Sequence, residues 1–285
     1  MRQVVPPRLI PLSFNLNGIP MKKPTPIHQL LTIMEDLRHP DTGCAWDKKQ
    51  TFETIAPYTI EEAYEVADAI KNNDQQSLKE ELGDLLFQIV FYAQISKEKG
   101  GFDFNDIVEG ISEKMVKRHP HVFGKKVFVS IEDQNLAWEE QKALERSKNT
   151  KEKGILAGVA HALPALLRAQ KLQKRAARVG FDWPNNGPVI EKIREELEEV
   201  TDALKLKNNK KKIAEEIGDL LFTCVNLARH ANIEAEQALM AGNEKFQRRF
   251  QSIENGLKRS GRSVEDCSLE DLEGLWNEAK SEERP

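Results

Sequence analysis

The chain carries the pattern EEAYE at residues 61–65, followed by ELGD at residues 81–84. The same arrangement returns later as EELEE at residues 195–199 and EIGD at residues 216–219. The second acidic group starts 16 positions after the first one ends in the earlier copy, and 17 positions after it in the later copy. Two paired-carboxylate motifs with nearly the same spacing predict a duplicated functional unit, because surface acids alone would not repeat in this way.

Each motif places two acidic side chains three positions apart, which brings them to one face of a helix. If the two helices of a copy pack antiparallel, four carboxylates converge, and they cannot all stay ionised at short range without a cation. Oxygen ligands without histidine or cysteine favour magnesium, with manganese possible. The sequence therefore predicts two metal sites, one formed by Glu62, Glu65, Glu81 and Asp84, the other by Glu196, Glu199, Glu216 and Asp219.

An ordinary solvated helix face is the alternative interpretation of these carboxylates. Asp84 and Asp219 argue against it, because they lie in the sequences LGDLLF and IGDLLF, where we expect the helix to become buried. A buried aspartate without a partner is costly, so it requires a cation or several hydrogen-bond donors. Gly83 and Gly218 each cost about 1 kcal/mol relative to alanine inside a helix. Close packing of the helices beside the acids would explain why glycine is present at these positions. Close packing with no functional role would explain it equally well.

Length and charge limit the class of protein. At 285 residues the chain is long enough for two domains, each with its own core. Its 42 basic and 46 acidic residues give a net charge of −4, so we expect neither nucleic acid nor a membrane as a partner. Cys44, Cys224 and Cys267 form no disulfide framework or C-x-x-C pattern, and no apolar run is long enough to span a membrane. A cytoplasmic location with reduced thiols is predicted.

Hydrophobic periodicity predicts helices throughout, and no segment shows the two-residue alternation of a strand. The chain is therefore predicted to be all-α and to be a tandem duplication. The expected helices cover about residues 27–38, 59–71, 77–97, 104–117 and 131–146 in the first half, and about 164–178, 189–205, 213–231, 233–256 and 269–282 in the second.

Two helices of the first half have a clear apolar pattern. The helix over 77–97 is apolar on most sides beyond Leu82, so we expect it to be buried. The helix over 59–71 is expected to turn an apolar face inward that consists of Ile60, Ala63, Val66, Ala67 and Ile70.

Composition divides the chain into four segments. Residues 1–24 are predicted to be a disordered extension, or to follow a start codon placed too early, because four prolines fall within the first 20 positions. Residues 25–146 and 164–285 are predicted to be the two helical domains. Residues 147–163, rich in lysine and glycine, are predicted to be the linker between them.

Basic and aromatic residues also recur after the acids. A lysine and an arginine four positions apart, then a tryptophan and a lysine four positions apart, stand at Lys114, Arg118, Trp138 and Lys142, and again at Lys245, Arg249, Trp276 and Lys280. Basic pairs of this kind are often solvated, and a tryptophan is often part of a core. Their recurrence favours phosphate binding by the cations and contact between a flat ring and the indole.

These motifs closely resemble the MazG family of nucleoside triphosphate pyrophosphohydrolases, part of the all-α NTP pyrophosphatase group. The pattern E-E-x-x-E … E-x-x-D, present twice, carries the resemblance, which extends from about Ile27 to the C-terminus. The resemblance implies two tandem helical-bundle domains that are completed by dimerisation, and so a homodimer or a larger homo-oligomer. It also implies magnesium-dependent hydrolysis of NTPs and dNTPs between the α and β phosphates, giving a nucleoside monophosphate and pyrophosphate.

The resemblance further implies roles for individual residues of the C-terminal half. Metal binding and catalysis would fall to Glu196, Glu199, Glu216 and Asp219. Contacts with the nucleotide would come from Lys192, Lys212, Lys245, Arg249, Trp276 and Lys280. Which glutamate acts as the general base is left open.

The two halves differ in the cations that precede the acids. Lys192 and Lys212 each stand four positions before a glutamate of the second copy, where the first copy has Tyr58 and Ser77. Because a triphosphate requires cations, we expect the C-terminal site to carry most of the activity. The N-terminal site is expected to bind metal but to bind or turn over nucleotide poorly.

Two other functions stay open at this point. A pyrophosphatase for a narrower substrate, of the dUTP or phosphoribosyl-ATP type, would use the same acids. A non-catalytic helical interaction protein would use them only to keep a dimer in solution, and magnesium would then not raise its thermal stability.

Overall fold

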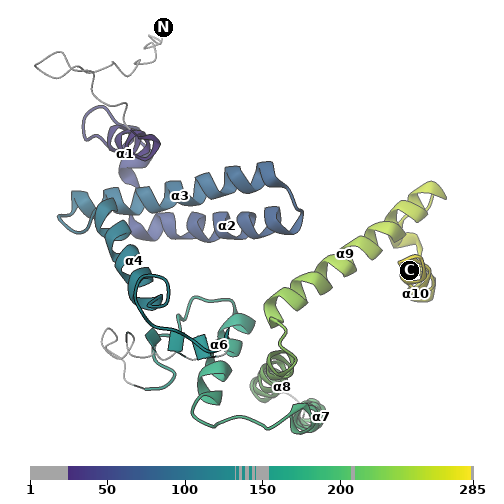
Figure 1. Cartoon of the computed structure of the whole chain (residues 1–285). Helices are drawn as coiled ribbons and strands as arrows, with labels where there is room; N and C mark the ends of the chain where they lie inside the picture. Colours follow the sequence, from purple (N-terminus) through teal and green to yellow (C-terminus); the bar gives the residue numbers. More distant parts are fainter. Residues whose placement is uncertain are drawn as a thin grey trace, which may run out of the picture. The chain divides into compact units, whose positions relative to one another are not determined.

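A computed structural model describes residues 25–131, 133–134, 137–138, 141–142, 145, 154–206 and 209–283. Every regular element in this part of the chain is an α-helix or a short 3₁₀ helix, so the all-α prediction is confirmed. No helix within it combines the length and the apolar character needed to cross a membrane. The chain divides after Trp138 into two compact units, and each of them contains one long helical hairpin (Figure 1).

Unit 1 contains α1 (Pro26–Leu37), the 3₁₀ helix η1 (Asp47–Lys49), α2 (Phe52–Lys71), α3 (Gln75–Glu98) and α4 (Phe104–Arg118). Unit 2 contains α6 (Ala165–Ala177), α7 (Asn186–Lys205), α8 (Lys210–His230), α9 (Ala235–Arg259), the 3₁₀ helix η2 (Val264–Asp266) and α10 (Leu269–Glu282). The acidic motifs lie on α2 and α3 in unit 1 and on α7 and α8 in unit 2.

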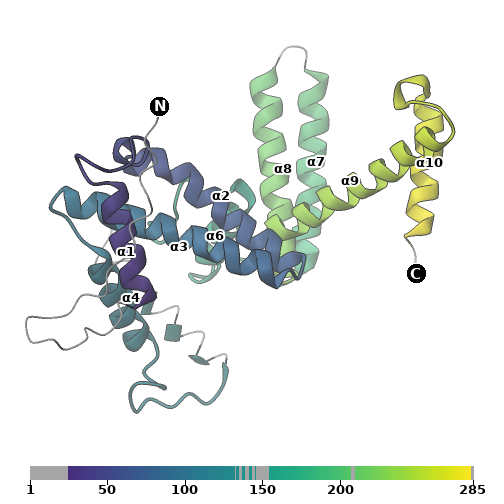
Figure 2. The same cartoon turned by 90° about the horizontal axis from the view of Figure 1, so that it is seen from above.

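Each unit is built around its hairpin. α2 packs along α3, and α7 packs along α8, as Figures 1 and 2 show. The turn between α2 and α3 is short because Asn73 adopts a φ of 53°, a left-handed conformation that asparagine tolerates. Asp74 then caps α3, since its side chain accepts hydrogen bonds from the backbone N–H groups of Gln76 and Ser77. The hairpins set the acids of two helices opposite each other.

The core of unit 1 lies where α1 and α2 pack on the C-terminal half of α3. Its nearly fully buried members are Met34, Ile55, Val90, Phe91 and Ile95. This core anchors one end of the hairpin. The acidic end of α3 lies outside it.

In unit 2 a buried glutamine joins α6 to the start of α9. The Gln170 side chain donates a hydrogen bond to the carbonyl of Ile233 at 3.0 Å and accepts one from the N–H of Ala235 at 3.1 Å. Both ends of this buried amide are therefore satisfied, which is the normal condition for a polar group in a protein interior.

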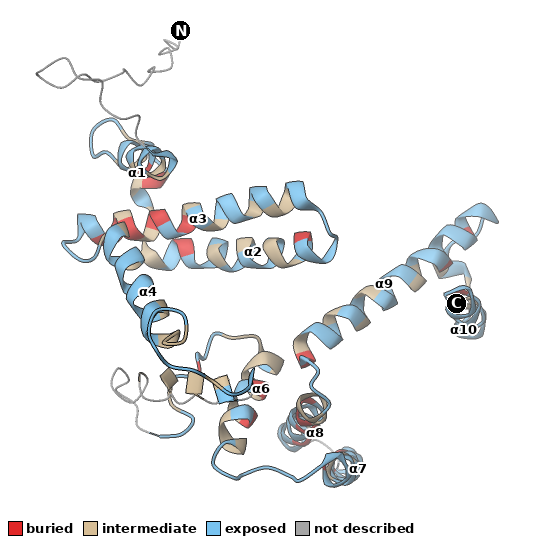
Figure 3. Ribbon diagram, in the orientation of Figure 1, coloured by how far each residue is buried: buried red, intermediate tan, exposed pale blue. Residues whose placement is uncertain are grey.

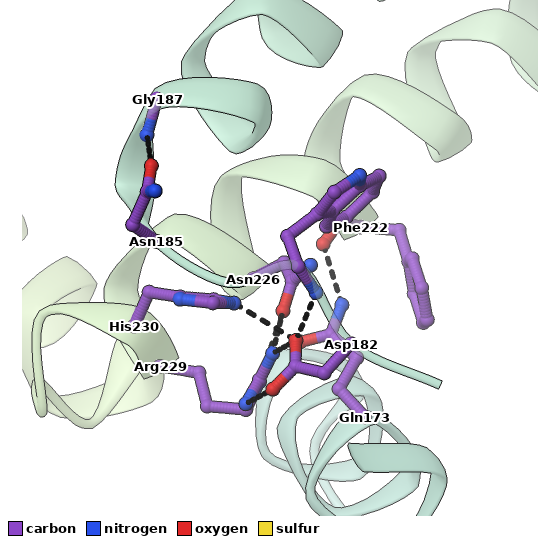
Figure 4. Close-up of polar contacts among 9 residues, drawn as sticks. Gln173, Asp182, Asn185, Gly187, Phe222, Asn226, Arg229 and His230 are labelled. Carbon is purple, nitrogen blue, oxygen red and sulfur yellow. Dashed lines mark hydrogen bonds and ion pairs between the residues drawn. The ribbon is translucent and has the colours of Figure 1, made fainter. Parts of the chain in front are cut away.

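The loop that follows α6 is fixed to α8 by Asp182. Arg229 Nη1 donates to Asp182 Oδ2 at 2.9 Å, and His230 Nε2 lies 2.9 Å from Asp182 Oδ1 (Figure 4). A bidentate guanidinium–carboxylate pair has a defined geometry, so it sets the position of the loop as well as its charge.

Several helices begin earlier than the sequence predicted, and α2 and α7 show the local reason. The helix predicted from Thr59 begins at Phe52 and continues through Pro57. A capping box between Thr51 and Thr54 and the burial of Ile55 offset the hydrogen bond that the proline cannot donate. Similarly, α7 begins at Asn186 instead of Val189, because the Asn185 side chain accepts a hydrogen bond from the N–H of Gly187 at 2.9 Å.

The predicted apolar faces are only partly buried (Figure 3). Ile60 and Ile70, expected to face inward, are 52% and 59% exposed, and Leu82 of α3 is 49% exposed. α2 buries a different stripe that contains Ile55 and Ala69. In a single copy of the chain, the prediction of an inward-facing face is therefore wrong at Ile60 and Ile70. The prediction of a central, buried helix is confirmed for the C-terminal half of α3, where Val90, Phe91 and Ile95 lie in the core.

Part of the predicted organisation lies outside the described residues. This holds for all of the predicted extension, 1–24, and for residues 147–153 of the predicted linker. The helix predicted over 131–146 is described at some positions only, and it is helical there. The domain limits at 25–146, 147–163 and 164–285 therefore stay predictions.

Replacing Asp182 with asparagine should lower the Tm by about 2–4 °C at neutral pH. Hydrogen bonds from Arg229, and then from His230, lower the pKa of Asp182 to about 2. The carboxylate therefore stabilises the fold above its unfolded pKa of about 3.9, and this contribution is lost as the pH falls through the folded value. The Tm difference between Asp182→Asn and the wild type should shrink between about pH 4 and pH 2, as calorimetry can measure.

Asp202→Asn is the matched control, because Asp202 forms an exposed pair with Lys205. It should change the Tm little at any pH. A Tm difference for Asp182→Asn that stays constant down to pH 2 would contradict the assignment.

Candidate active site

α7 and α8 bring three predicted metal ligands together. Carboxylate oxygens of Glu196 on α7 and of Glu216 and Asp219 on α8 lie within 4.8 Å of one another. Glu196 and Glu216 are only 5% and 4% exposed, whereas Asp219 is exposed. The expectation that the aspartates are the buried acids is wrong here, and also for Asp84 in unit 1. The contact between the helices of unit 2 falls on the glutamates and leaves the aspartate at its edge.

One of the buried glutamates, Glu196, has fewer partners than its charge requires. Glu196 Oε2 is buried and has no hydrogen-bond partner among the described residues, while Glu196 Oε1 lies 3.0 Å from Lys192 Nζ. A buried anionic oxygen without a donor is costly. Three carboxylates at this separation also match the oxygen ligand sets of magnesium. The residues present therefore fit a divalent cation.

Glu199, the fourth predicted ligand, interacts electrostatically with this group. Burial raises the pKa of Glu199, and the charges of Glu196 and Glu216 raise it further. The cluster thus repels additional negative charge, which a bound cation would relieve.

Unit 1 repeats the arrangement. Carboxylate oxygens of Glu62 on α2 and of Glu81 and Asp84 on α3 lie within 4.8 Å of one another. Burial, and then the charges of Asp84 and Glu65, raise the pKa of Glu62. Burial, and then Glu65 and Asp84, likewise raise the pKa of Glu81. Gln88 Nε2 donates a long hydrogen bond of 3.4 Å to Glu62 Oε1. Both hairpins therefore gather acids that repel one another.

Lysines offset this repulsion in unit 2. Lys192 Nζ lies 2.7 Å from Glu195 Oε1 and 3.0 Å from Glu196 Oε1, and hydrogen bonds to these two groups raise the pKa of Lys192. Lys212 pairs with Glu216, and this hydrogen bond raises the pKa of Lys212. Each lysine reaches forward one helical turn to the acid, as the four-residue spacing predicts.

In unit 1 the corresponding positions hold Tyr58 and Ser77, which carry no charge at neutral pH. The two sites thus share their acids and differ in their cations. The lysines of unit 2 contact its acids directly, and the uncharged residues at the matching positions of unit 1 cannot form such ion pairs.

The other predicted nucleotide contacts lie on α9 and α10. The Arg249 guanidinium lies 5.5 Å from the centre of the Trp276 ring, and Arg249 Nε donates to Glu283 Oε2 at 2.8 Å. Lys245 and Lys280 are exposed. Among the described residues, no hydrogen bond or ion pair joins any of these four side chains to the acids of α7 and α8. The structure thus groups Arg249 with Trp276, and the roles of all four stay predictions.

Sequence reasoning missed a cavity beside α8. It has a volume of about 520 Å³ and is lined by α6, by the loop that follows it and by the C-terminal half of α8. Comparing the repeats could have indicated it, because Asn226 stands seven positions after Asp219, where the first copy has Phe91 seven positions after Asp84. A polar residue in place of a core aromatic is the sequence feature that marks the cavity.

Comparison with known proteins identifies the family. A family model described as "MazG nucleotide pyrophosphohydrolase domain" matches residues 50–123 and 187–253, which include both acidic hairpins. The nucleoside triphosphate pyrophosphohydrolase of Escherichia coli K12 is 50% identical over 258 residues, covering 90% of this chain and 98% of that protein. The chain belongs to the MazG family. The MazG domain is present twice, and the prediction of a hydrolase of this class is confirmed.

One further relative agrees with this assignment. The nucleoside triphosphate pyrophosphohydrolase/pyrophosphatase MazG of Thermotoga maritima is 42% identical over 252 residues, covering 88% of this chain and 94% of that protein. A crystal structure of a mazG-related protein from the same organism is 31% identical, covers 41% of this chain and 98% of its own, and superposes with a TM-score of 0.36.

Replacing Lys192 and Lys212 together with methionine should tighten the binding of Mn²⁺ in the absence of nucleotide by roughly tenfold. In the unsubstituted protein, the ammonium groups of both lysines contact carboxylate oxygens that a metal would use. Methionine cannot make these contacts, so the variant no longer competes with the metal. Electron paramagnetic resonance of free Mn²⁺ measures the effect directly.

Lys205→Met combined with Lys211→Met is the control, because it removes the same charge from lysines that pair with Asp202 and Glu215 outside the cluster. An equal gain in the control would mean that general charge, and not competition at the acids, is responsible. Unchanged or weaker binding in the first variant would mean that the lysines do not compete with the metal.

Proposed function

We propose that this MazG family member hydrolyses nucleoside and deoxynucleoside triphosphates to a monophosphate and pyrophosphate, with Mg²⁺ as cofactor and mainly at the C-terminal site. The observation that carries the proposal is the buried cluster of Glu196 and Glu216, with Asp219 beside it and a lysine on each glutamate. The E. coli and T. maritima relatives are both named nucleoside triphosphate pyrophosphohydrolases.

The proposed metal ligands are Glu196, Glu199, Glu216 and Asp219. When bound there, magnesium would neutralise phosphate oxygens and so lower the cost of the charge that develops during hydrolysis. A carboxylate oxygen of the cluster that holds no cation can accept a hydrogen bond from the attacking water and take its proton. Glu196 Oε2 and the exposed Asp219 both leave oxygens available for these roles.

Lys192 and Lys212 are proposed to bind the triphosphate. In the structure each lysine contacts a carboxylate that the metal would use, so a bound metal would leave both ammonium groups free beside the site. Released ammonium groups are suitable partners for phosphate oxygens, since a lysine acts as a compact, mobile positive charge. The absence of both cations in unit 1 is the reason for assigning slower turnover to the site of Glu62, Glu65, Glu81 and Asp84.

The remaining nucleotide contacts are proposed to come from Lys245, Arg249, Trp276 and Lys280. Arg249 and Trp276 already lie together, and both lysines are exposed. An exposed lysine and an arginine beside an indole suit a ligand with both phosphate and a flat ring.

The working form is proposed to be a homodimer or a larger homo-oligomer in the cytoplasm. Large apolar side chains are exposed on both hairpins, among them Ile60, Ile70, Leu82, Leu197, Leu204 and Leu221. Large apolar side chains that one copy of the chain leaves exposed on a helical hairpin are suited to contact with a second copy. The three cysteines are free, as in proteins of reducing compartments.

Sedimentation equilibrium should give at least twice the monomer mass at micromolar concentration, because a second copy would cover the exposed apolar side chains. A monomer would contradict the proposal.

Replacing Glu196 and Glu199 together with alanine should reduce kcat by at least about a hundredfold, because two proposed metal ligands are lost. The matched variant, Glu62→Ala with Glu65→Ala, removes the same groups from unit 1 and should retain more than about half of the activity. Pyrophosphate release from each common NTP and dNTP, with and without Mg²⁺, is the measurement.

Phosphate should be detected only after inorganic pyrophosphatase is added, since the bond cleaved lies between the α and β phosphates. Near-normal turnover by Glu196→Ala with Glu199→Ala would reverse the assignment of the two halves. Turnover of a single nucleotide in the panel would instead favour the narrower-substrate alternative. Thermal melting of each variant shows whether it folds.

A further inference from the structure

The segment that precedes α6 lies against that helix and forms an open cavity with it in unit 2. The cavity has a volume of about 730 Å³, which is within the range of small-molecule sites. Residues 154–161 form one side of it and α6 forms the other. Its described lining contains no acidic residue. The residues that matter here are Ile155, Leu156, Val159, His161, Arg168 and Leu172.

Arg175 of α6 holds this segment in place. Its Nη1 donates to the carbonyl of Leu156 at 3.1 Å and also to that of Ala157, and its Nη2 donates to the carbonyl of Gly158 at 3.3 Å. A planar guanidinium that is bonded to three successive carbonyls fixes the backbone that carries them. The wall of the cavity is therefore set by the fold itself.

Arg168, two turns before Arg175 on the same helix, has no comparable partners. Its Nε is buried and lacks a hydrogen-bond partner among the described residues, and its Nη2 lies 3.1 Å from His161 Nδ1 in a contact exposed to solvent. No ion pair joins Arg168 to a carboxylate in the described part of the chain. Other inward-lying arginines each have such a pair, namely Arg38, Arg229 and Arg249. The half-buried charge of Arg168 is thus left without a counter-ion.

His161 adds a second hydrogen-bond donor beside Arg168. A guanidinium only donates, so His161 Nδ1 accepts from it, and the proton of the neutral imidazole is then on Nε2. Glu236 is the acid at this end of α6, and its Oε2 accepts from the N–H of Leu167 at 3.4 Å instead of pairing with Arg168. The polar part of the cavity therefore presents donors and positive charge, which an anion requires.

The remaining side chains of the lining are apolar. Ile155 and Leu156 are largely exposed to solvent, so an apolar ligand that covered them would remove their surface from water. Leu156 and Leu172 also line the neighbouring cavity between α6 and α8. The apolar surface thus continues along α6 beyond Arg168, and an extended apolar chain can contact it.

We propose that this cavity binds a small organic anion that consists of an acidic head group on an apolar chain. Arg168 Nη2 and His161 Nε2 donate to the oxygens of the head group, and the chain lies against Ile155, Leu156 and Leu172. Carboxylates and phosphate monoesters share this chemistry. None of the lining residues belongs to the acid clusters, so the inference goes beyond the proposed hydrolysis and does not depend on it.

Isothermal titration calorimetry with octanoate tests the head group and the chain together. The wild type should bind octanoate at least about tenfold more tightly than 1-octanol, which lacks the charge, or acetate, which lacks the chain. Arg168→Met should weaken octanoate binding roughly tenfold to a hundredfold and leave 1-octanol binding nearly unchanged. Lys171→Met removes the same charge from an exposed position of α6 outside the lining, so it should change either affinity less than about twofold.

Ile155→Asn tests the contact with the chain at an exposed position, where folding should tolerate the change. It should reduce the gain in affinity from butanoate to octanoate, while the effect of Arg168→Met persists. Octyl phosphate then distinguishes the head groups. Tighter binding than octanoate identifies a phosphate monoester and weaker binding identifies a carboxylate, and both results support the shared chemistry.

Equal octanoate affinities of Arg168→Met and the wild type would overturn the proposal. Equal affinities of the wild type for octanoate and 1-octanol, or no binding of octanoate, would do the same. If Arg168→Met does not melt cooperatively, His161→Asn at an exposed position replaces it. This variant should weaken octanoate binding about threefold to tenfold, and an unchanged affinity would count against the proposal.

Two controls locate the ligand. Octanoate should leave both the affinity for Mn²⁺ and the mass in sedimentation equilibrium unchanged. A lower affinity for Mn²⁺ would place the anion at the acid clusters instead, and a fall in mass would make this surface an interface between copies of the chain. Either result would overturn the proposal.

Discussion

The burial of two like charges, Glu196 and Glu216, in the contact between α7 and α8 is the constraint on which the C-terminal unit depends. Helix packing that forces carboxylates together is unfavourable unless positive charge enters the same space. Lys192 and Lys212 supply that charge from the preceding turn of each helix. The two lysines thus offset part of the repulsion between acids that are grouped as a metal site requires.

The sequence was sufficient for the features that follow from periodicity. The order of the helices, the duplication and the convergence of Glu196, Glu216 and Asp219 all depend on spacing along a helix, which a sequence states directly. Spacing does not state which side of a helix meets its neighbour. For that reason the sequence named Asp219 as the buried acid, whereas the helix contact encloses the glutamates.

Other features depend on energies that compete locally. Pro57 is unfavourable inside a helix, yet the cap at Thr51 and the burial of Ile55 extend α2 beyond it. The cavity could not be predicted from local pattern at all, because it results from α6 and α8 approaching each other with Gln173 and Asn226 between them. Only a comparison of the two repeats, which shows Asn226 at the position where the first copy has Phe91, indicates the cavity.

The contact between Asp182 and Arg229 has a consequence for how such enzymes diversify. Arg229 holds Asn226 in the wall of the α6–α8 cavity, and Asp182 in the α6–α7 connection holds Arg229. The shape of this cavity is thereby partly set by a short connecting segment, apart from the acid cluster of α7 and α8. Exchange of that segment between relatives would alter the cavity and leave the acids and the helical framework in place.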